Sequence, residues 1–363
     1  MESDVKPQKS MQAALGQKEP YLFFGPCSAE SLSQLRNTAE GLQKNFSQII
    51  FRAGLWKPRT RPNSFEGVGA QGLPWLQSIK KEFGFKVTTE VASAQHVEQC
   101  LKHEIDVLWI GARTTVNPFL VQEIAEALRG CNVPVFVKNP IHPDLSLWLG
   151  GIERLQQQNT GPIGAIHRGF HLVNNGAYRN HPQWDMAIKL KAEHPDLPLI
   201  TDASHISGKP ELIPYVAQKA FDLDMDGLMI ETHCRPQEAL SDVQQQITPA
   251  NLFLLHRSLT RKAESSANPE YKNNLEKLRD EIDQIDDHLL EELAKRMQIA
   301  KQIGEYKKNN KVTVLQVSRW QKILQERQEY GEALGLSSSF IEDLLHSIHK
   351  ESIKQQTAPF EDD

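Results

Sequence analysis

The chain of 363 residues has no excess of charge of either sign, because 41 lysines and arginines face 46 aspartates and glutamates and the net charge is -5. Such a balance creates no overall field that would favour nucleic acid or an anionic membrane as a partner. The sequence also lacks an apolar run long enough to span a membrane, and residues 1–20 are too polar for a signal peptide. We therefore expect a cytoplasmic protein that binds neither nucleic acid nor membrane.

Cysteine is scarce as well, and the four residues of this type are spread along the chain with no paired short spacing. A reducing compartment argues against a disulfide framework. Internal repeats and low-complexity segments are absent, apart from an alternation of strand-like and helix-like segments. At 363 residues the chain is long enough for two domains, each with its own core.

Apolar, β-rich segments recur along the first two-thirds of the chain, with helical patterns between them. This alternation predicts an all-parallel sheet, and eight strands over about 240 residues match an α/β fold of the (β/α)8, or TIM-barrel, type. The predicted strands cover residues 21–24, 48–52, 86–90, 107–111, 133–138, 163–168, 199–202 and 227–231.

The segment after the second predicted strand is rich in cations. It reads Arg-Ala-Gly-Leu-Trp-Lys-Pro-Arg-Thr-Arg over residues 52–61, and Gly54 and Pro58 break any helix that would carry these side chains. Arginine offers a planar fork for phosphate or carboxylate and lysine a mobile point charge, so the mixture suits a ligand that bears both groups. We therefore predict a loop that binds small anions.

Each predicted strand delivers a chemically capable residue at its C-terminal end, where barrels of this kind place their active sites. One set is cationic and suits anionic substrates: Arg52, Lys57, Arg59, Arg113, Lys138 and Arg168. A second set offers sulfur, nitrogen and oxygen: Cys27, His205, Glu231 and Asp242. This mixed set suits one borderline divalent ion, such as Mn, Fe, Co or Zn.

Each metal ligand also has a simpler interpretation. Cys27 alone would be a buried thiol and His205 alone a hydrogen-bonded core histidine, since free cysteine is among the most buried residue types. Together at one rim, they favour the metal site. Cys234 is a competing ligand candidate close to Glu231, and His233 is a weak candidate for a supporting role.

These residues lie in segments that resemble the motifs of type I 3-deoxy-D-arabino-heptulosonate 7-phosphate (DAHP) synthases. The segments are Gly25-Pro-Cys-Ser-Ala-Glu30, Lys57-Pro-Arg-Thr60, Thr89-Glu90, Ile110-Gly-Ala-Arg113, Asp202-Ala-Ser-His205, Gly227-Leu-Met-Ile-Glu231 and Ser241-Asp242. The resemblance covers roughly residues 20–260. It implies a metal-dependent condensation of phosphoenolpyruvate with erythrose 4-phosphate, the first step of the shikimate pathway, with loss of phosphate.

The resemblance also implies residue roles. The metal ligands would be Cys27, His205, Glu231 and Asp242. Phosphoenolpyruvate would contact Arg52, Lys57, Glu90, Arg113, Lys138 and Arg168, and the aldose phosphate Arg59 and Thr60. Glu90, His205 or a water on the metal remain alternatives for the proton handler.

Two rival activities share the barrel. Synthases that condense phosphoenolpyruvate with arabinose 5-phosphate, or with an amino sugar, resemble this family but lack the Lys-Pro-Arg-Thr loop, so residues 57–60 favour the tetrose. A Schiff-base aldolase that uses Lys57 or Lys138 is the second rival, and the metal set argues against it. The sequence departs from the family pattern at His167 and over residues 178–181, so we assign no role to Arg179.

After a polar linker the pattern changes wholly to helix. Apolar residues recur every three or four positions from Leu275 to Ile303, which predicts one long amphipathic helix. Two shorter helical stretches follow near residues 318–330 and 338–354. We expect an N-terminal extension over 1–20, a barrel over 21–260, a linker over 261–270, an all-α domain over 271–358 and a tail over 359–363. So small a helical domain cannot bury its long stripe alone and should dimerise; whether dimers pair into tetramers stays open.

The helical domain resembles the all-α chorismate mutase family over roughly residues 271–358. The matching positions are Arg279, Arg296, Lys307, Arg319, Ser352 and Gln356. The resemblance implies rearrangement of chorismate to prephenate without a cofactor, and therefore a bifunctional enzyme. From periodicity alone, the cations on the first helix would be read as side chains at the edge of a coiled coil.

Helix geometry adds a further expectation. Arg279 and Arg296 are seventeen residues apart, which on a straight helix is about 26 Å, too far for one small dicarboxylate to bridge. Each site should therefore take Arg279 from a partner chain. Gln316 and Trp320 stand where many relatives have acids, which leaves a second interpretation open: a single-activity synthase whose helical domain dimerises and senses prephenate or chorismate, with feedback on the barrel.

Overall fold

The computed structural model describes residues 10–16, 18, 20–58, 64–158, 160–173, 175–262 and 268–361. The chain divides into two compact units, Met1–Glu264 and Ser265–Asp363, and each is described by itself. Among the described residues, no helix combines the length and the apolar character needed to cross a membrane.

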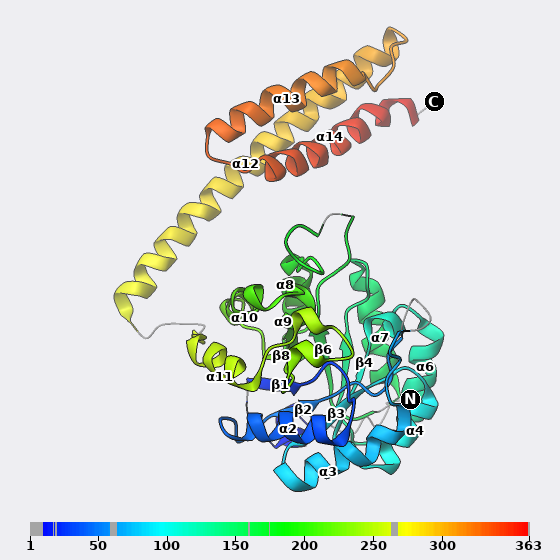
Figure 1. Cartoon of the computed structure of the whole chain (residues 1–363). Helices are drawn as coiled ribbons and strands as arrows, with labels where there is room; N and C mark the ends of the chain where they lie inside the picture. The colour runs from blue at the N-terminus through cyan, green and yellow to red at the C-terminus, as the bar shows by residue number, and fades with distance from the viewer. Residues whose placement is uncertain are drawn as a thin grey trace. The chain divides into compact units, whose positions relative to one another are not determined.

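The first unit is a closed barrel of eight parallel strands in sequential order, which confirms the predicted barrel (Figure 1). The strands are β1 (Tyr21–Gly25), β2 (Ile50–Arg52), β3 (Lys86–Val91), β4 (Val107–Ile110), β5 (Val135–Lys138), β6 (Ile163–His167), β7 (Leu199–Asp202) and β8 (Gly227–Glu231). The barrel closes where β1 pairs with β8, in a register that places Gly25 beside Glu231. The carboxyl ends of the two strands therefore meet at one rim.

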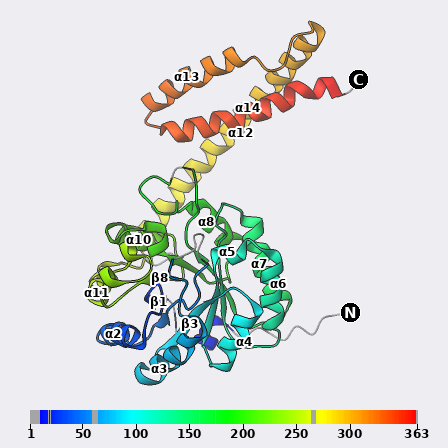
Figure 2. The same cartoon turned by 45° about the vertical axis from the view of Figure 1, so that its right-hand side comes forward.

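Helices surround the strands, as the turned view in Figure 2 shows. They are α2 (Leu32–Gln43), α3 (Leu73–Phe83), α4 (Ala94–Lys102), α5 (Ala112–Thr115), α6 (Pro118–Ala127), α7 (Leu145–Gln157), α8 (Trp184–Glu193), α9 (Ala203–Ser207), α10 (Ile213–Asp222) and α11 (Pro249–Ser258). Local sequence fixes where several of them begin. Ser31, for example, accepts a hydrogen bond from the Gln34 amide at the start of α2, which satisfies one free helical donor.

The side chains of each strand alternate between two cores. Phe23 lies in the interior of the barrel with Trp109 and Phe136, whereas its neighbours Leu22 and Phe24 pack outward under the helices. The short N-terminal helix α1 (Met11–Leu15) joins the interior core through both of its terminal residues, which are buried. Part of the predicted N-terminal extension therefore packs against the barrel interior.

The second unit consists of α12 (Pro269–Asn309), α13 (Val317–Ala333) and α14 (Ser338–Glu361). Gly304 lets α12 and α14 approach closely, because a Cβ at this position would lie 2.5 Å from the Gln356 carbonyl oxygen. The N-terminal half of α12 carries an apolar stripe that is more than half exposed, including Leu278, Ile282 and Ile285. The predicted barrel and C-terminal helical domain are both present.

We expect His167 to make the barrel sensitive to acid. Burial lowers the pKa of this side chain from 6.5 to about 4 in the folded protein. As the pH falls, the imidazole is protonated near pH 6.5 in the unfolded chain but only near pH 4 in the folded protein. The free energy of unfolding is therefore unaffected above pH 6.5 and decreases as the pH falls toward 4. At pH 5 the loss is about 2 kcal/mol. Urea unfolding of the wild type and of His167→Gln at pH 7 and pH 5 measures it, and an equal pH dependence in both proteins would contradict the expectation.

Candidate active sites

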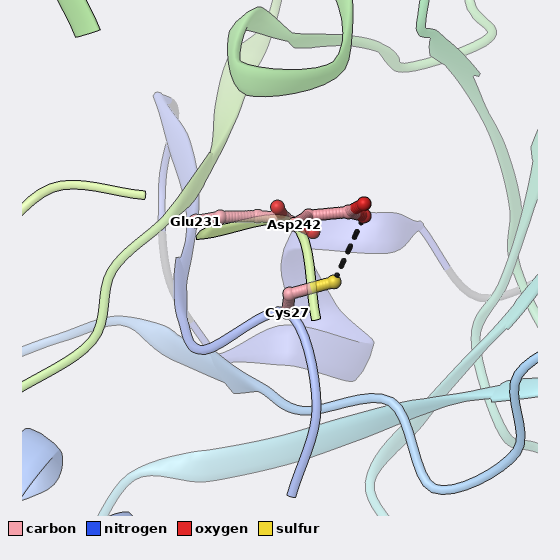
Figure 3. Close-up of side chains that lie close together, drawn as sticks. All are labelled: Cys27, Glu231 and Asp242. Carbon is pink, nitrogen blue, oxygen red and sulfur yellow. Dashed lines mark hydrogen bonds between the residues drawn. The ribbon is translucent and has the colours of Figure 1, made fainter. Parts of the chain in front are cut away.

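A thiol and two carboxylates meet at the rim of the barrel. Cys27 follows β1 and is fully buried, Glu231 ends β8, and Asp242 lies in the loop after β8. Their sulfur and oxygen atoms all lie within 4.8 Å of one another, and Cys27 Sγ is 3.2 Å from Asp242 Oδ2 (Figure 3). The structure therefore brings together three of the four predicted metal ligands.

His205, the fourth predicted ligand, lies beside this cluster. It is on α9, directly after β7, and its Nδ1 is 3.8 Å from Glu231 Oε1. The same nitrogen lies 2.9 Å from Asp202 Oδ2, and Asp202 also accepts a hydrogen bond from the His205 amide. Asp202 thus fixes the orientation of the imidazole ring.

The electrostatics of the cluster suit a divalent cation. Burial, together with the nearby Glu231 carboxylate, raises the pKa of the Cys27 thiol to about 12. The pKa of Asp242 lies below its usual range, because Arg179 and His205 outweigh the opposing effect of burial. The cluster thus holds ionised carboxylates beside a thiol that a cation would help to deprotonate. A sulfur, nitrogen and oxygen donor set fits the borderline ions predicted from the sequence.

Several residues that support the cluster were missed by sequence reasoning. Arg179 pairs with Asp242 at 3.2 Å, Gln245 Nε2 donates to Glu231 Oε2 at 2.6 Å, and Gln246 Oε1 accepts from the Cys27 amide at 3.0 Å. The two glutamines closely follow Asp242 in the chain, but no periodicity marks them. Their positions become meaningful only once the loop after β8 is folded.

A cavity of about 700 Å³ opens beside the cluster. The predicted site residues that line it are Lys57, Glu90, Arg113, Lys138, Arg168, His205 and Asp242, and Arg179 joins them. Lys57 Nζ lies 3.1 Å from Cys27 Sγ, and Lys138 Nζ lies 2.7 Å from Asp202 Oδ2. Cations, acids and a histidine from the carboxyl ends of seven strands, β2 to β8, or the loops after them therefore meet in one pocket.

Arg52 and Glu90 are held by specific contacts. Arg52 is 1% exposed and pairs with Glu231 at 3.1 Å, while its other terminal nitrogen donates to the Cys27 carbonyl. Glu90 Oε2 accepts from the Trp109 indole at 3.0 Å. Gly111 makes room for this carboxylate, because a Cβ there would lie 2.1 Å from Glu90 Oε1. Arg59 and Thr60, the predicted contacts of the aldose phosphate, lie outside the described residues.

The helical unit contains a second candidate site, a cavity of about 330 Å³. The predicted residues that line it are Arg296, Lys307, Arg319, Ser352 and Gln356, together with Gln316 and Trp320. Lys307 Nζ donates to Gln356 Oε1 at 3.0 Å, and Arg296 donates to Ser352 Oγ. A single chain therefore gathers five of the six predicted residues around one pocket.

Arg279 lies apart from this group within the unit. Its side chain is 61% exposed and pairs with Glu276 on the same helix at 3.0 Å. The sequence also missed His349, which lines the cavity and stacks on Trp320. Its spacing of three and seven residues before Ser352 and Gln356 is the signal that would have found it.

The fold and the first site define a class: a closed parallel barrel whose charged residues gather at the carboxyl ends of its strands, where barrel enzymes bind their ligands. A family model described as the DAHP synthetase I family matches residues 4–265, and the chain belongs to this family. A second model, chorismate mutase type II, matches residues 278–357. The chain is therefore a DAHP synthase-family domain fused to a chorismate mutase domain.

Individual relatives carry two different names. A phospho-2-dehydro-3-deoxyheptonate aldolase of Thermotoga maritima is 28% identical over 226 residues, which are 62% of this chain and 64% of the relative. A 2-dehydro-3-deoxyphosphooctonate aldolase of Helicobacter acinonychis is 30% identical over 256 residues, which are 64% of this chain and 91% of the relative. The two identities are nearly equal, so sequence identity alone does not show which of the two relatives this chain resembles more.

A solved structure that carries the first of these names is also similar to this chain. The crystal structure of the phospho-2-dehydro-3-deoxyheptonate aldolase (DAHP synthase) of Thermotoga maritima aligns with a TM-score of 0.59 and 26% identity, and the alignment covers 65% of this chain and 67% of that chain.

We expect Cys27→Ala to abolish tight binding of a divalent ion without unfolding the barrel, because it removes the only sulfur donor of the cluster. Metal content after dialysis, with Mn or Zn titrated back by calorimetry, measures the loss. Cys234→Ala is the matched control, since Cys234 Sγ contacts the Gln34 carbonyl and not the cluster. Retained metal affinity in Cys27→Ala, or an equal loss in the control, would contradict the assignment.

Proposed function

We propose that the barrel condenses phosphoenolpyruvate with erythrose 4-phosphate to give DAHP and phosphate. The observation that carries the proposal is the cavity of about 700 Å³, in which four predicted cations lie next to the thiol–carboxylate cluster. A substrate with a phosphate and a carboxylate needs several cations for its charge. The family membership supports the same reaction class.

Different residues of the cavity have different roles in this proposal. Arg113, Lys138 and Arg168 orient the phosphate and carboxylate, and orientation alone can supply several kcal/mol of the barrier reduction. A divalent ion held by Cys27, His205, Glu231 and Asp242 would polarise the aldehyde carbonyl of the second substrate. Glu90 lines the cavity and is held by Trp109, which makes it one candidate for the proton handler. His205 and a water on the metal are the alternatives.

The second substrate is the point at which the relatives diverge. One relative is named for a heptonate product and another for an octonate product, at similar identity. The Lys-Pro-Arg-Thr sequence of residues 57–60 favours erythrose 4-phosphate over arabinose 5-phosphate.

We expect purified full-length protein with added Mn to consume phosphoenolpyruvate rapidly with erythrose 4-phosphate and at least tenfold more slowly with arabinose 5-phosphate. The measurement is the loss of phosphoenolpyruvate absorbance together with release of phosphate. Lys138→Met should slow the reaction with either sugar, because it removes a buried cation that lines the cavity. A preference for arabinose 5-phosphate would overturn the proposed substrate while leaving the reaction class intact.

We propose that the helical unit rearranges chorismate to prephenate. Its cavity presents Arg296, Lys307 and Arg319, which suit the two carboxylates of the substrate. Lys307 and Gln356 are hydrogen-bonded to each other and can stabilise charge that develops on the breaking ether oxygen. The reaction needs no nucleophile and no cofactor, so these donors account for the chemistry.

Dimerisation is part of this proposal. The exposed stripe of α12, with Leu278, Ile282, Ile285 and Leu289 each more than half exposed, is an apolar surface that a second copy of the helix can cover. Arg279 lies on the same exposed half of α12. We propose that a partner chain packed on this stripe supplies its Arg279 to the cavity. The site would then be complete only in the dimer.

A mixing experiment tests the mutase and the dimer together. We expect Arg279→Ala and Arg296→Ala each to abolish chorismate loss, because each variant lacks one cation in every site. When the variants are unfolded and refolded together, half of the dimers are mixed and one of their two sites is intact, so about a quarter of the wild-type activity returns. No recovery, with both variants folded, would contradict a site shared between chains.

The alternative is a helical unit that senses prephenate or chorismate and inhibits the barrel without turning chorismate over. The observation in its favour is Trp320, which lines the cavity at a position where a charged acid would be expected to contact the ligand. Binding of prephenate by the wild type in the absence of any chorismate loss would favour this alternative.

A further inference from the structure

The cavity of the helical unit contains an aromatic stack for which the proposed mutase chemistry has no role. Trp320 of α13 and His349 of α14 lie face to face, with ring centroids 3.9 Å apart and an interplanar angle of 14°. His346, one turn earlier on α14, lies in a T-shaped arrangement with the same indole, with ring centroids 5.4 Å apart. Trp320 and His349 line the cavity with Arg296 and Lys307.

The spacing along α14 directs His349 to the ligand side of the helix. His349, Ser352 and Gln356 are three and seven residues apart, so they share one face. Ser352 and Gln356 contact Arg296 and Lys307, respectively, on α12. The stack on Trp320 then holds the imidazole in one orientation.

The cavity has many hydrogen-bond donors and few free side-chain acceptors among the described residues that line it. Among the described residues that line it, three are lysine or arginine and none is aspartate or glutamate. Donors for carboxylates are therefore abundant, whereas a ligand hydroxyl needs an acceptor. The Ser352 and Gln356 oxygens already interact with Arg296 and Lys307. Gln316 and His349 provide the remaining side-chain acceptors among the lining residues.

We propose that His349, held by its stack on Trp320, accepts a hydrogen bond from the ring hydroxyl of the bound dicarboxylate and so helps to select hydroxylated ligands. The proposal rests on the proposed mutase function, because it concerns the same cavity. It assigns to an aromatic pair the task that a carboxylate would otherwise perform, without placing a negative charge beside an anionic ligand.

The groups around His349 favour the neutral form that this role requires. Burial lowers the pKa of His349, and the neighbouring Arg296, His346 and Lys307 lower it further. Arg296 and Lys307 come from α12, the uncharged Trp320 comes from α13, and His346 comes from its own helix. The neutral ring has one acceptor nitrogen, which protonation removes. Hydroxyl recognition should therefore weaken as the pH falls.

Three variants of the full-length protein test the proposal: His349→Ala, His349→Gln and the control His346→Gln. The measurement is kcat/KM for chorismate from about pH 5 to pH 8. We expect His349→Ala to lower kcat/KM about tenfold, because one hydrogen bond in the site is lost. His349→Gln supplies an acceptor that does not titrate, so it should stay within about threefold of the wild type and lose the fall of kcat/KM at low pH. His346→Gln should keep that fall.

The results distinguish a failure of the role proposed for His349 from a failure of the proposed mutase activity. Wild-type kcat/KM and an unchanged pH profile in His349→Ala would overturn the role of His349 and leave the mutase standing. If the wild type does not turn chorismate over, the mutase fails, and calorimetric binding of prephenate to the same proteins decides the inference. About tenfold weaker binding by His349→Ala would support it, and an unchanged dissociation constant would overturn it. Circular dichroism checks the fold, and His349→Gln keeps the test decisive if His349→Ala is unfolded.

Discussion

The buried ion pair between Arg52 and Glu231 is the interaction on which the rim of the barrel depends. Its side chains are 1% and 0% exposed and its charged atoms are 3.1 Å apart. Removal of one partner from such a pair leaves an unpaired buried charge, at a cost of about 3–5 kcal/mol. Arg52 also donates to the Cys27 carbonyl, and Glu231 also accepts from Gln245. One pair therefore fixes the ends of β1, β2 and β8 together, and with them two of the three clustered donors.

Sequence reasoning reached the barrel because its evidence is local and periodic. Eight short apolar segments with helices between them admit few architectures, and the C-terminal residue of each strand must lie at one rim. Lys138, Arg168 and Glu231 were predicted in this way to lie at the rim, where the structure has them. Arg179, Gln245 and Gln246 were not, since they lie in loops whose path no periodicity determines. Their contacts join residues more than sixty positions apart or depend on the turn after β8, so they emerge only from the fold.

In the helical unit too, features that depend on one segment of the chain were predicted from the sequence, and contacts between distant segments were not. A 3.6-residue period predicted the long stripe of α12. The resemblance to the all-α chorismate mutases, and not the period, predicted the five residues that line one cavity. The stack of His349 on Trp320 joins two helices, so neither helix alone reveals it. From the sequence alone, Trp320 in place of an expected acid removes a hydrogen-bond acceptor from the site. In the folded unit, Trp320 stacks on His349 and orients its imidazole ring.

The cations of the two candidate sites have different surroundings. In the barrel, carboxylates pair with cations: Asp202 with Lys138, Glu231 with Arg52 and Asp242 with Arg179. Those acids hold the cations in place and provide oxygen donors for a divalent ion. The helical cavity has no acid among its described lining residues. Arg296, Lys307 and Arg319 therefore have no carboxylate partner among the described residues that line the cavity. The barrel site thus combines cations with acids that can also hold a divalent ion, whereas the described lining of the helical cavity combines cations with neutral polar groups.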